Sequence, residues 1–238
     1  MNILILGYGK MGRIIEQTAL SRGHRIGYKI NADNLHEMAQ INAAQVDVAV
    51  EFSEPGAVLG NLHFCFGHHI PVVCGTTGWL DRRSEVERQC MNKNGALFHS
   101  SNYSLGVNVF FHLNKVLAKL MNRYPEYDVV LDETHHTEKK DAPSGTALTL
   151  AGDVLDNIGR KTNWVNNPAK NVSELAILSH REPNVPGTHI VRYTSAIDDI
   201  EITHTAHSRE GFALGAVLAA EWLVGKHGVF GMEDMLGF

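Results

Sequence analysis

Four potential cations lie within six residues near the middle of the chain: His135, His136, Lys139 and Lys140. They follow a strand predicted over 127–134 and precede a helix predicted over 144–158. Like charges at this spacing repel one another, and an anionic ligand would compensate them. An imidazole, whose ordinary pKa is about 6.5, can also donate a proton to a reacting atom. The stretch predicts an anion site with acid–base chemistry, although histidines and lysines at a strand end are also common on solvated surfaces.

The helix that follows offers further groups to an anion. Ser144 is predicted to cap this helix, which leaves backbone N–H groups near Gly145 and Thr146 free to donate. A carboxylate would find these groups, a threonine hydroxyl and cationic side chains together. A metal is not expected, because adjacent histidines on a strand point to opposite faces and no cysteine or carboxylate stands at ligand spacing.

The N-terminus carries a glycine-rich turn between a predicted strand and a predicted helix. Gly7 would permit the tight turn, Gly9 would let the backbone approach a pyrophosphate, and Gly12 would let the helix pack on the strand. The helix N-terminus then favours a phosphate. The alternative is a tight turn without a ligand. The residues expected to contact a dinucleotide are those of the turn itself: Gly7, Tyr8, Gly9, Lys10, Met11 and Gly12.

The choice between NADH and NADPH stays open. An acidic residue at the end of the second strand would hold the ribose 2′-OH and favour NAD. Asn31 stands there instead, while Asp33 and Lys29 lie within two residues of it. Asp33 favours NADH, whereas Lys29 would tolerate a 2′-phosphate.

Two more turns follow predicted strands, at the strand ends where open α/β sheets bind ligands. They contain Phe52 and Ser53 in the first, and Gly75, Thr76 and Thr77 in the second. Both could hold the nicotinamide riboside. Alternatively, Ser53 is only a helix cap, and the threonines only form a turn.

Strands and helices alternate through the first hundred residues. Strands are predicted over 1–6, 25–30, 46–52, 72–74 and 96–99, and helices over 12–22, 35–44, 55–66 and 81–92. This alternation predicts an α/β domain with a Rossmann-like, doubly wound parallel sheet.

The pattern then changes. A helix over 107–124 has apolar residues at helical spacing, and strands are predicted over 127–134, 173–180, 189–195 and 200–205, with a surface loop over 160–173. We expect a smaller α+β domain with a four-stranded mixed sheet, for substrate binding and oligomerisation, over residues 106–208. The last helix, 211–224, is nearly all apolar and should be deeply buried. Residues 1–105 and 209–238 would form the dinucleotide-binding domain.

The composition argues weakly against two classes of partner. With 21 Lys and Arg against 26 Asp and Glu, the net charge is −5, which does not favour nucleic acid or an anionic membrane surface. No segment is long and apolar enough to span a membrane, and no signal peptide is recognised. The three cysteines have no metal-like spacing and fit a reducing compartment, so we expect a cytoplasmic protein.

The stretch 133–147 resembles the dihydrodipicolinate reductase family, whose pattern E-x-H-H-x-x-K-x-D-A-P-S-G-T-A it matches at every fixed position. Other segments extend the resemblance over the whole chain, namely 7–12, 52–55, 75–78, 101–108 and 201–209. Among them, Ser101, Asn102 and Tyr103 match a segment on the cofactor side.

The resemblance implies roles for individual residues. His135 matches the general acid and Lys139 the lysine that assists protonation, while His136, Lys139, Gly145 and Thr146 match the pocket for the two carboxylates of a small dicarboxylate substrate. It further implies an NADH- or NADPH-dependent reductase of lysine biosynthesis, a C-terminal helix that returns to the first domain, and a homotetramer built through the second sheet. The alternatives are another two-domain dehydrogenase, a non-catalytic dinucleotide sensor, and a metal-dependent hydrolase.

Overall fold

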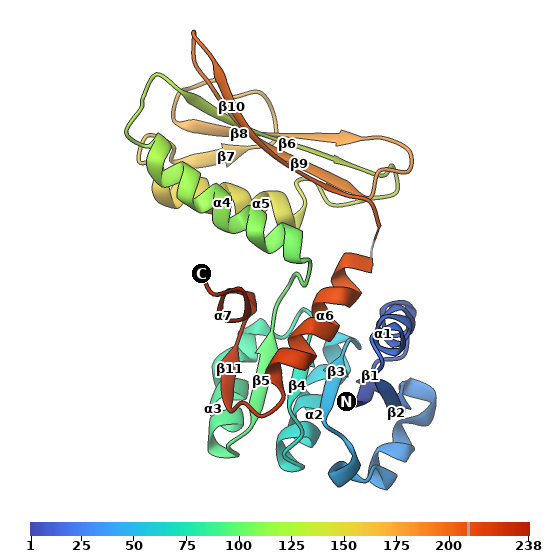
Figure 1. Ribbon diagram of the computed structural model, residues 1–238. Coiled ribbons are helices and arrows are strands. Elements are labelled where there is room, and N and C mark those ends of the chain that lie inside the picture. Colours follow the sequence, from blue (N-terminus) through green and yellow to red (C-terminus); the bar gives the residue numbers. More distant parts are fainter. Residues whose placement is uncertain (209) are drawn as a thin grey trace. The chain divides into compact units, whose positions relative to one another are not determined.

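The computed structural model describes residues 1–208 and 210–238, which divide into two units: residues 1–105 with 210–238, and residues 106–208 (Figure 1). Arg209, where the sequence analysis places the return to the first domain, lies outside the described residues. The described chain enters the first unit again with α6 (Glu210–Leu223).

The first unit contains a six-stranded parallel sheet in the order β11-β5-β4-β3-β1-β2. Strand order grows in both directions from β1, so the sheet is doubly wound, as predicted. The strands are β1 (Asn2–Leu6), β2 (Arg25–Ile30), β3 (Val48–Glu51), β4 (Val72–Cys74), β5 (Ala96–His99) and β11 (Gly228–Phe230).

Helices cover both faces of this sheet (Figure 1). Ile3 and Ile5 pack with α1 (Lys10–Ser21) and α6, whereas Leu4 and Leu6 pack with α2 (Pro55–Gly67) and α3 (Arg83–Asn92). All four side chains are buried. An uninterrupted apolar run therefore forms β1, because neither face of the strand meets water.

Several details of the first unit differ from the prediction. The segment expected as a helix over 35–44 is two 3₁₀ helices, η1 (Ala32–Gln40) and η2 (Ala43–Gln45), and η3 (Leu80–Arg82) precedes α3. Asn31 starts η1 early, because its side chain accepts the N–H groups of Asp33 and Asn34. Beyond α6, which is buried as expected, β11 adds a sixth strand and α7 (Met232–Leu236) a further helix. Both elements are too short to produce a periodic signal.

The second unit has a mixed sheet of five strands in the order β10-β9-β6-β8-β7, so the prediction of four strands was wrong. The extra strand, β7 (Asn163–Val165), lies in the segment predicted as a loop and pairs with only three residues of β8. The others are β6 (Asp128–His135), β8 (Glu174–Arg181), β9 (Gly187–Thr194) and β10 (Asp199–Ala206). The helices α4 (Leu105–Met121) and α5 (Gly145–Asn157) pack on one face.

The long helix α4 carries apolar residues on a face that is not buried in this unit. It packs with Phe110, Ala118 and Met121 and with the polar Asn114, which donates to Leu150 O at 3.1 Å. Four of its apolar residues are instead exposed: Val109, Leu113, Val116 and Leu120. Helical spacing therefore marked an apolar stripe that does not belong to the core of this unit.

Candidate active site

The glycine turn after β1 has the geometry that a dinucleotide requires. Gly7 has a positive φ of 97°, and a Cβ there would lie 2.1 Å from Phe52 O. A Cβ at Gly12 would lie 2.3 Å from Gly7 O, so only glycine lets α1 approach the turn this closely. At Gly9, the N-cap of α1, a Cβ would meet nothing within 4 Å. The helix start is therefore open on the side from which a phosphate would approach.

A pocket of about 500 Å³ opens beside this turn, at the carboxyl ends of β1, β2 and β3. Among the predicted cofactor residues, it is lined by Gly7, Tyr8, Gly9, Asn31, Phe52 and Ser53. It also includes residues that the sequence analysis did not assign, namely Glu54, Ala57 and Asn61. Ala57 and Asn61 are four residues apart on α2, a spacing that places them on one helix face. The size and position of the pocket fit the adenosine half of a dinucleotide.

The side chains of Lys29, Asn31 and Asp33, at the end of β2, have different surroundings. Asp33 lines the pocket and is exposed, whereas Lys29 pairs with Glu16 at 3.2 Å and lies over the Tyr8 ring at 4.8 Å from its centroid. Asn31 uses its side-chain oxygen to cap η1. Asp33 is therefore the charged side chain of the ribose region that lines the pocket.

The turns after β3 and β4 touch each other, as their position at the sheet edge predicts. Ser53 N donates to Thr76 Oγ1 at 2.8 Å. The Ser53 hydroxyl donates to the buried Glu51, and Asn61 donates to the same carboxylate at 3.1 Å. Ser53 is not the helix cap considered above, because Glu54 occupies that position and makes no side-chain cap.

The other predicted cofactor residues differ in exposure. Thr77 and Ser101 are exposed, and Lys10 and Met11 stand in the first turn of α1. The Tyr103 side chain lies in the core, where its hydroxyl donates to Cys74 O at 2.7 Å. The backbone of Tyr103 is packed as well, because a Cβ at Gly215 on α6 would lie 1.7 Å from Tyr103 O.

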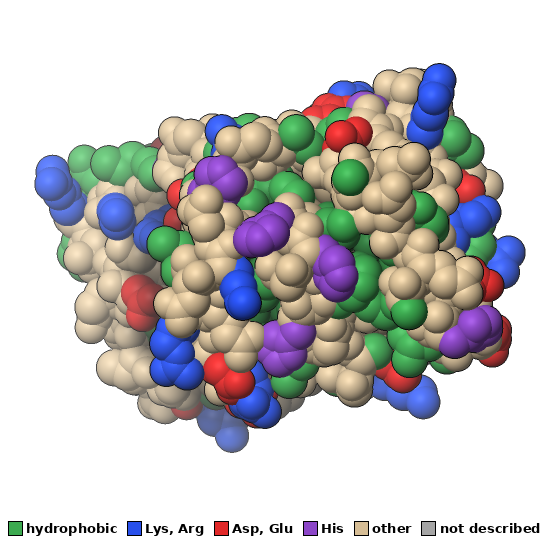
Figure 2. Space-filling model, turned by 90° about the horizontal axis from the view of Figure 1, so that it is seen from below, with side chains coloured by type: hydrophobic (Ala, Val, Ile, Leu, Met, Phe, Trp, Pro, Cys, Tyr) green, Lys and Arg blue, Asp and Glu red, His purple; other side chains and the backbone are tan. Residues whose placement is uncertain are grey.

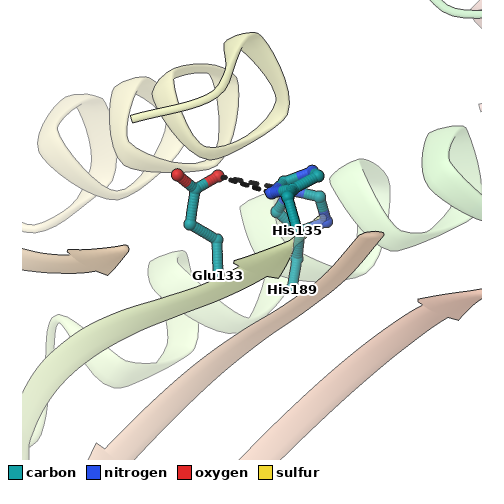
Figure 3. Close-up of side chains that lie close together, drawn as sticks. All are labelled: Glu133, His135 and His189. Atoms are coloured by element: carbon teal, nitrogen blue, oxygen red, sulfur yellow. Dashed lines mark ion pairs between the residues drawn. The ribbon is translucent and has the colours of Figure 1, made fainter. Parts of the chain in front are cut away.

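In the second unit, the sheet gathers a buried polar cluster around Glu133. Glu133 on β6 lies opposite His189 on β9 and Ser179 on β8, and His135 follows two residues later on the same face. Figure 3 shows that both histidines point toward the Glu133 carboxylate. His135 Nδ1 lies 3.5 Å and His189 Nε2 3.7 Å from Glu133 Oε2, and the two rings meet edge to face at 5.0 Å. Strand register alone therefore assembles the cluster.

His189, Ser179 and Arg181 were missed in the sequence. For His189 a signal existed, because residues 187, 189, 191 and 193 alternate inward on β9, which makes His189 a polar residue among core positions. Arg181 donates to Lys139 O at 3.3 Å and Asp141 O at 2.6 Å. It therefore holds the loop that carries the predicted catalytic lysine.

Burial and hydrogen bonds set the protonation of the cluster. Burial raises the pKa of Glu133, but hydrogen bonds from Ser144 and Ser179 outweigh it, so the pKa is lower than usual. Burial lowers the pKa of His135, and the Glu133 carboxylate opposes this effect. Burial, followed by repulsion from His135, lowers the pKa of His189 to about 4. Near neutral pH, Glu133 is ionised and His189 is neutral.

Glu133, His135 and His189 could also be considered as metal ligands, because their donor atoms lie within 4.8 Å of one another. The sequence analysis did not find this set. The carboxylate, however, already accepts the Ser144 N–H through both oxygens and the Ser179 hydroxyl at 2.8 Å. Oε1 thus accepts from both serines and Oε2 shares the Ser144 N–H, so part of the acceptor capacity of the carboxylate is already used, and the donor set fits a proton-handling cluster better.

The start of α5 presents the predicted anion donors. Ser144 is the N-cap, as expected, and its Oγ accepts from Ala147 N at 3.1 Å. The backbone N–H groups of Gly145 and Thr146 donate to no other residue of the described chain. These two groups are therefore available to a carboxylate.

Two predicted substrate residues have other neighbours in this structure. Lys139 Nζ lies 2.8 Å from both oxygens of Asp141. His136 lines a hollow of about 300 Å³ with Thr137, Glu138, Pro183 and Asn184. Both side chains remain partly exposed.

A glycine-rich turn beside a pocket in one unit, and a buried carboxylate–histidine cluster beside an open helix start in the other, are features of a two-domain NAD(P)-dependent oxidoreductase. Comparison with known proteins specifies the family. The model for the N-terminus of dihydrodipicolinate reductase matches residues 1–103, and the model for its C-terminus matches residues 106–236. The chain belongs to the dihydrodipicolinate reductase family.

Individual relatives agree with this assignment. The chain is 49% identical over 236 residues to a 4-hydroxy-tetrahydrodipicolinate reductase of Christiangramia forsetii, covering 99% of this chain and 98% of the relative. It is 37% identical over 201 residues to the enzyme of the same name from Methanosarcina mazei, covering 83% and 75%. A solved dipicolinate-bound dihydrodipicolinate reductase from Paenisporosarcina sp. TG-14 has the same fold, with a TM-score of 0.78, 18% identity and 98% coverage of both chains.

The fold alone does not single out this reaction. An engineered D-amino acid dehydrogenase bound to NADP⁺ matches with a TM-score of 0.54 and 14% identity, covering 100% of this chain and 98% of its own. The assignment to the family therefore rests on the family models and on sequence identity, and not on the sheet topology.

Proposed function

We propose that the protein reduces 4-hydroxy-tetrahydrodipicolinate to tetrahydrodipicolinate with NADH or NADPH, in the diaminopimelate route to lysine. The observation that carries this proposal is the buried Glu133–His135 pair next to the open start of α5. This arrangement supplies a proton donor and a carboxylate site within one unit. The reaction adds a hydride and a proton to the ring and releases water, so it needs a proton donor. The substrate is a dicarboxylate, so it also needs a site that binds carboxylates.

His135 is the proton donor in this proposal. The C4 hydroxyl leaves as water before or together with the reduction, and a bound reduced nicotinamide would supply the hydride that goes to C4 of the cyclic substrate. The electron pair displaced from the conjugated double bond then requires a proton at the adjacent carbon, and a protonated His135 provides it. Lys139 adds positive potential, which stabilises the negative charge that develops.

The substrate carboxylates bind at the cationic side of this cluster. The N–H groups of Gly145 and Thr146 and the Thr146 hydroxyl donate to one carboxylate, while His136 and Lys139 attract the dianion. The positive end of the α5 dipole adds to this attraction. A dicarboxylate is thus matched by donors and charge in the same unit.

The dinucleotide is held by the first unit. The residues proposed for this role are those of the glycine turn, Asn31, Phe52, Ser53, Gly75, Thr76, Thr77, Ser101, Asn102 and Tyr103. The open approach at Gly9 and the adjoining pocket support this assignment.

The test is a coupled assay at 340 nm with NADH and then NADPH. The substrate is made in situ from pyruvate and aspartate semialdehyde by the upstream synthase. We expect absorbance to fall only when the synthase is present. Folded protein that binds nucleotide but gives no fall with either cofactor would overturn the proposal in favour of a sensor or another dehydrogenase.

Assembly and location are part of the same proposal. The face of the second sheet opposite α4 and α5 carries the half-buried Val130 and Ile190, and we propose that further copies cover it in a homotetramer. Sedimentation equilibrium tests this, and a monomer would exclude it. No helix of the described chain could span a membrane, and cationic and anionic side chains are interspersed on the face shown in Figure 2. We propose a cytoplasmic enzyme whose three free cysteines, all buried, stay reduced.

A further inference from the structure

Glu133 connects the predicted proton donor to the predicted anion site. Its two carboxylate oxygens lie 3.0 and 3.1 Å from Ser144 N, the N-cap of α5, and Ser179 on β8 donates to one of them at 2.8 Å. The side chain is fully buried. A buried carboxylate held by donors from two neighbouring elements keeps both its charge and its position.

The two ring nitrogens of His135 have different surroundings. Nδ1 is fully buried and lies 3.5 Å from Glu133 Oε2, too long for a good hydrogen bond, and it has no hydrogen-bond partner among the described residues. Nε2 faces Gly187, where a Cβ would lie only 3.1 Å away. Glycine at position 187 therefore lets β9 pass close to the ring on this side. Nδ1 is thus the nitrogen that faces the anion, and Nε2 is the ring nitrogen that is not fully buried.

The other charged groups around His135 come from three more segments. Lys139 and Arg181 oppose its protonation, and Asp141 and Glu133 favour it. Of the two carboxylates, Glu133 has the larger influence, because Asp141 is exposed and paired with Lys139. His189 on β9 is neutral near pH 7 and adds no competing cation. Glu133 is therefore the main group that stabilises an imidazolium at His135.

We infer that Glu133 is a positioning residue for the proton transfer: it holds His135 with Nδ1 protonated and Nε2 available to the substrate, and it fixes the start of α5 relative to that ring. The inference rests on the proposed role of His135. One carboxylate then sets both the direction of the proton donor and the place of the Gly145 and Thr146 N–H groups, which gives a physical reason for a buried acid in this strand.

The first experiment is performed on the wild-type protein, so it does not depend on the folding of a variant at position 133. Histidine ring nitrogens are labelled with ¹⁵N, and the His135 signals are assigned by their loss in His135→Gln. We expect neutral His135 to be the Nδ1–H tautomer. A predominant Nε2–H tautomer would overturn the inference.

The second experiment compares Glu133→Gln with wild type in the coupled assay across pH. We expect kcat to fall at least about tenfold, with the Kd for NADH unchanged. A general acid acts in its protonated form, and Glu133 favours that form. Removing its charge should therefore move the alkaline loss of kcat/KM to lower pH.

A matched control removes the same charge near the other end of β6. Glu126→Gln changes an exposed carboxylate and should leave both kcat and the pH profile at wild-type values. A Glu133→Gln enzyme with an unshifted profile would contradict the positioning role, whatever its kcat. If His135→Gln retains wild-type activity, the proposed catalytic role of His135 fails, while the tautomer still decides whether Glu133 positions the ring.

Discussion

Both carboxylate oxygens of Glu133 lie within 3.1 Å of the backbone nitrogen of Ser144, so a side chain from the middle strand of one sheet caps the helix packed upon it. Ser144 in turn caps α5 through its own hydroxyl. Two of the first N–H groups of the helix are thus satisfied internally, and those of Gly145 and Thr146 remain for a ligand. The capping pattern therefore leaves these two N–H groups, at the positive end of the helix dipole, as the donors that we propose for an anion.

Replacing His135 by alanine should reduce kcat by about 10²- to 10⁴-fold, because a general acid contributes a factor of this size. The Kd for NADH, measured by fluorescence titration, should not change, since the proposed nucleotide residues belong to the other unit. A variant with near-normal kcat would remove His135 from the proposed role.

Thr146→Val should raise the KM for the dicarboxylate by about five- to tenfold, because it removes one hydroxyl donor without changing side-chain volume. The kcat should stay close to wild type. Thr149→Val is the matched control, since Thr149 is exposed one turn later and donates to Gly145 O at 3.1 Å. Equal KM values for the two variants would place the carboxylate elsewhere.

Asp33→Ala should raise kcat/KM with NADPH relative to kcat/KM with NADH. The substitution removes an exposed anion from the pocket that would receive a 2′-phosphate. We expect the ratio of the two kcat/KM values to change by roughly tenfold, the effect of about 1.4 kcal/mol. Glu37→Ala removes the same charge from the exposed side of η1 and should leave the ratio unchanged. The same ratio of kcat/KM values in both variants would show that Asp33 does not contribute to the choice between NADH and NADPH.

The stabilisation that the ion pair between Glu221 on α6 and Arg22 at the end of α1 provides should depend on pH. Glu221 accepts from Arg22 at 2.7 and 2.8 Å and contacts His24, and the hydrogen bond with Arg22 is the largest influence lowering the pKa of Glu221 to about 2. A lowered pKa in the folded state stabilises the protein above the ordinary carboxyl pKa, and this stabilisation disappears as pH falls towards 2.

Glu221→Gln should therefore destabilise the protein by about 1 kcal/mol at pH 7, a value reduced for solvent screening. Thermal unfolding at pH 7 and pH 3 measures the effect, and the difference from wild type should shrink at pH 3. Glu87→Gln, which breaks the exposed Arg83–Glu87 pair, should have almost no effect at either pH. A pH-independent difference would mean that the Glu221 ion pair is not its source.

Some errors of the sequence analysis have a common physical cause. In α4, Val109 and Leu113 follow the helical repeat as well as Phe110 does, yet only Phe110 is buried. Periodicity identifies an apolar stripe but cannot say which partner covers it, and the buried face of α4 even contains Asn114. The strand β7 was missed for a related reason, since three residues gain their stability from β8 and not from local propensity.

The sequence by itself determined the features that depend on neighbours along the chain. The glycine turn, the alternation of strands and helices, the Ser144 cap and the stretch 133–147 are local patterns whose geometry follows from backbone sterics and capping. The tertiary structure alone decided which distant residues join them. His189 and Ser179 reach Glu133 only through strand register, and Arg181 reaches the 139–141 loop only across the sheet. Register is set by the packing of the whole sheet on its helices, which no local segment encodes.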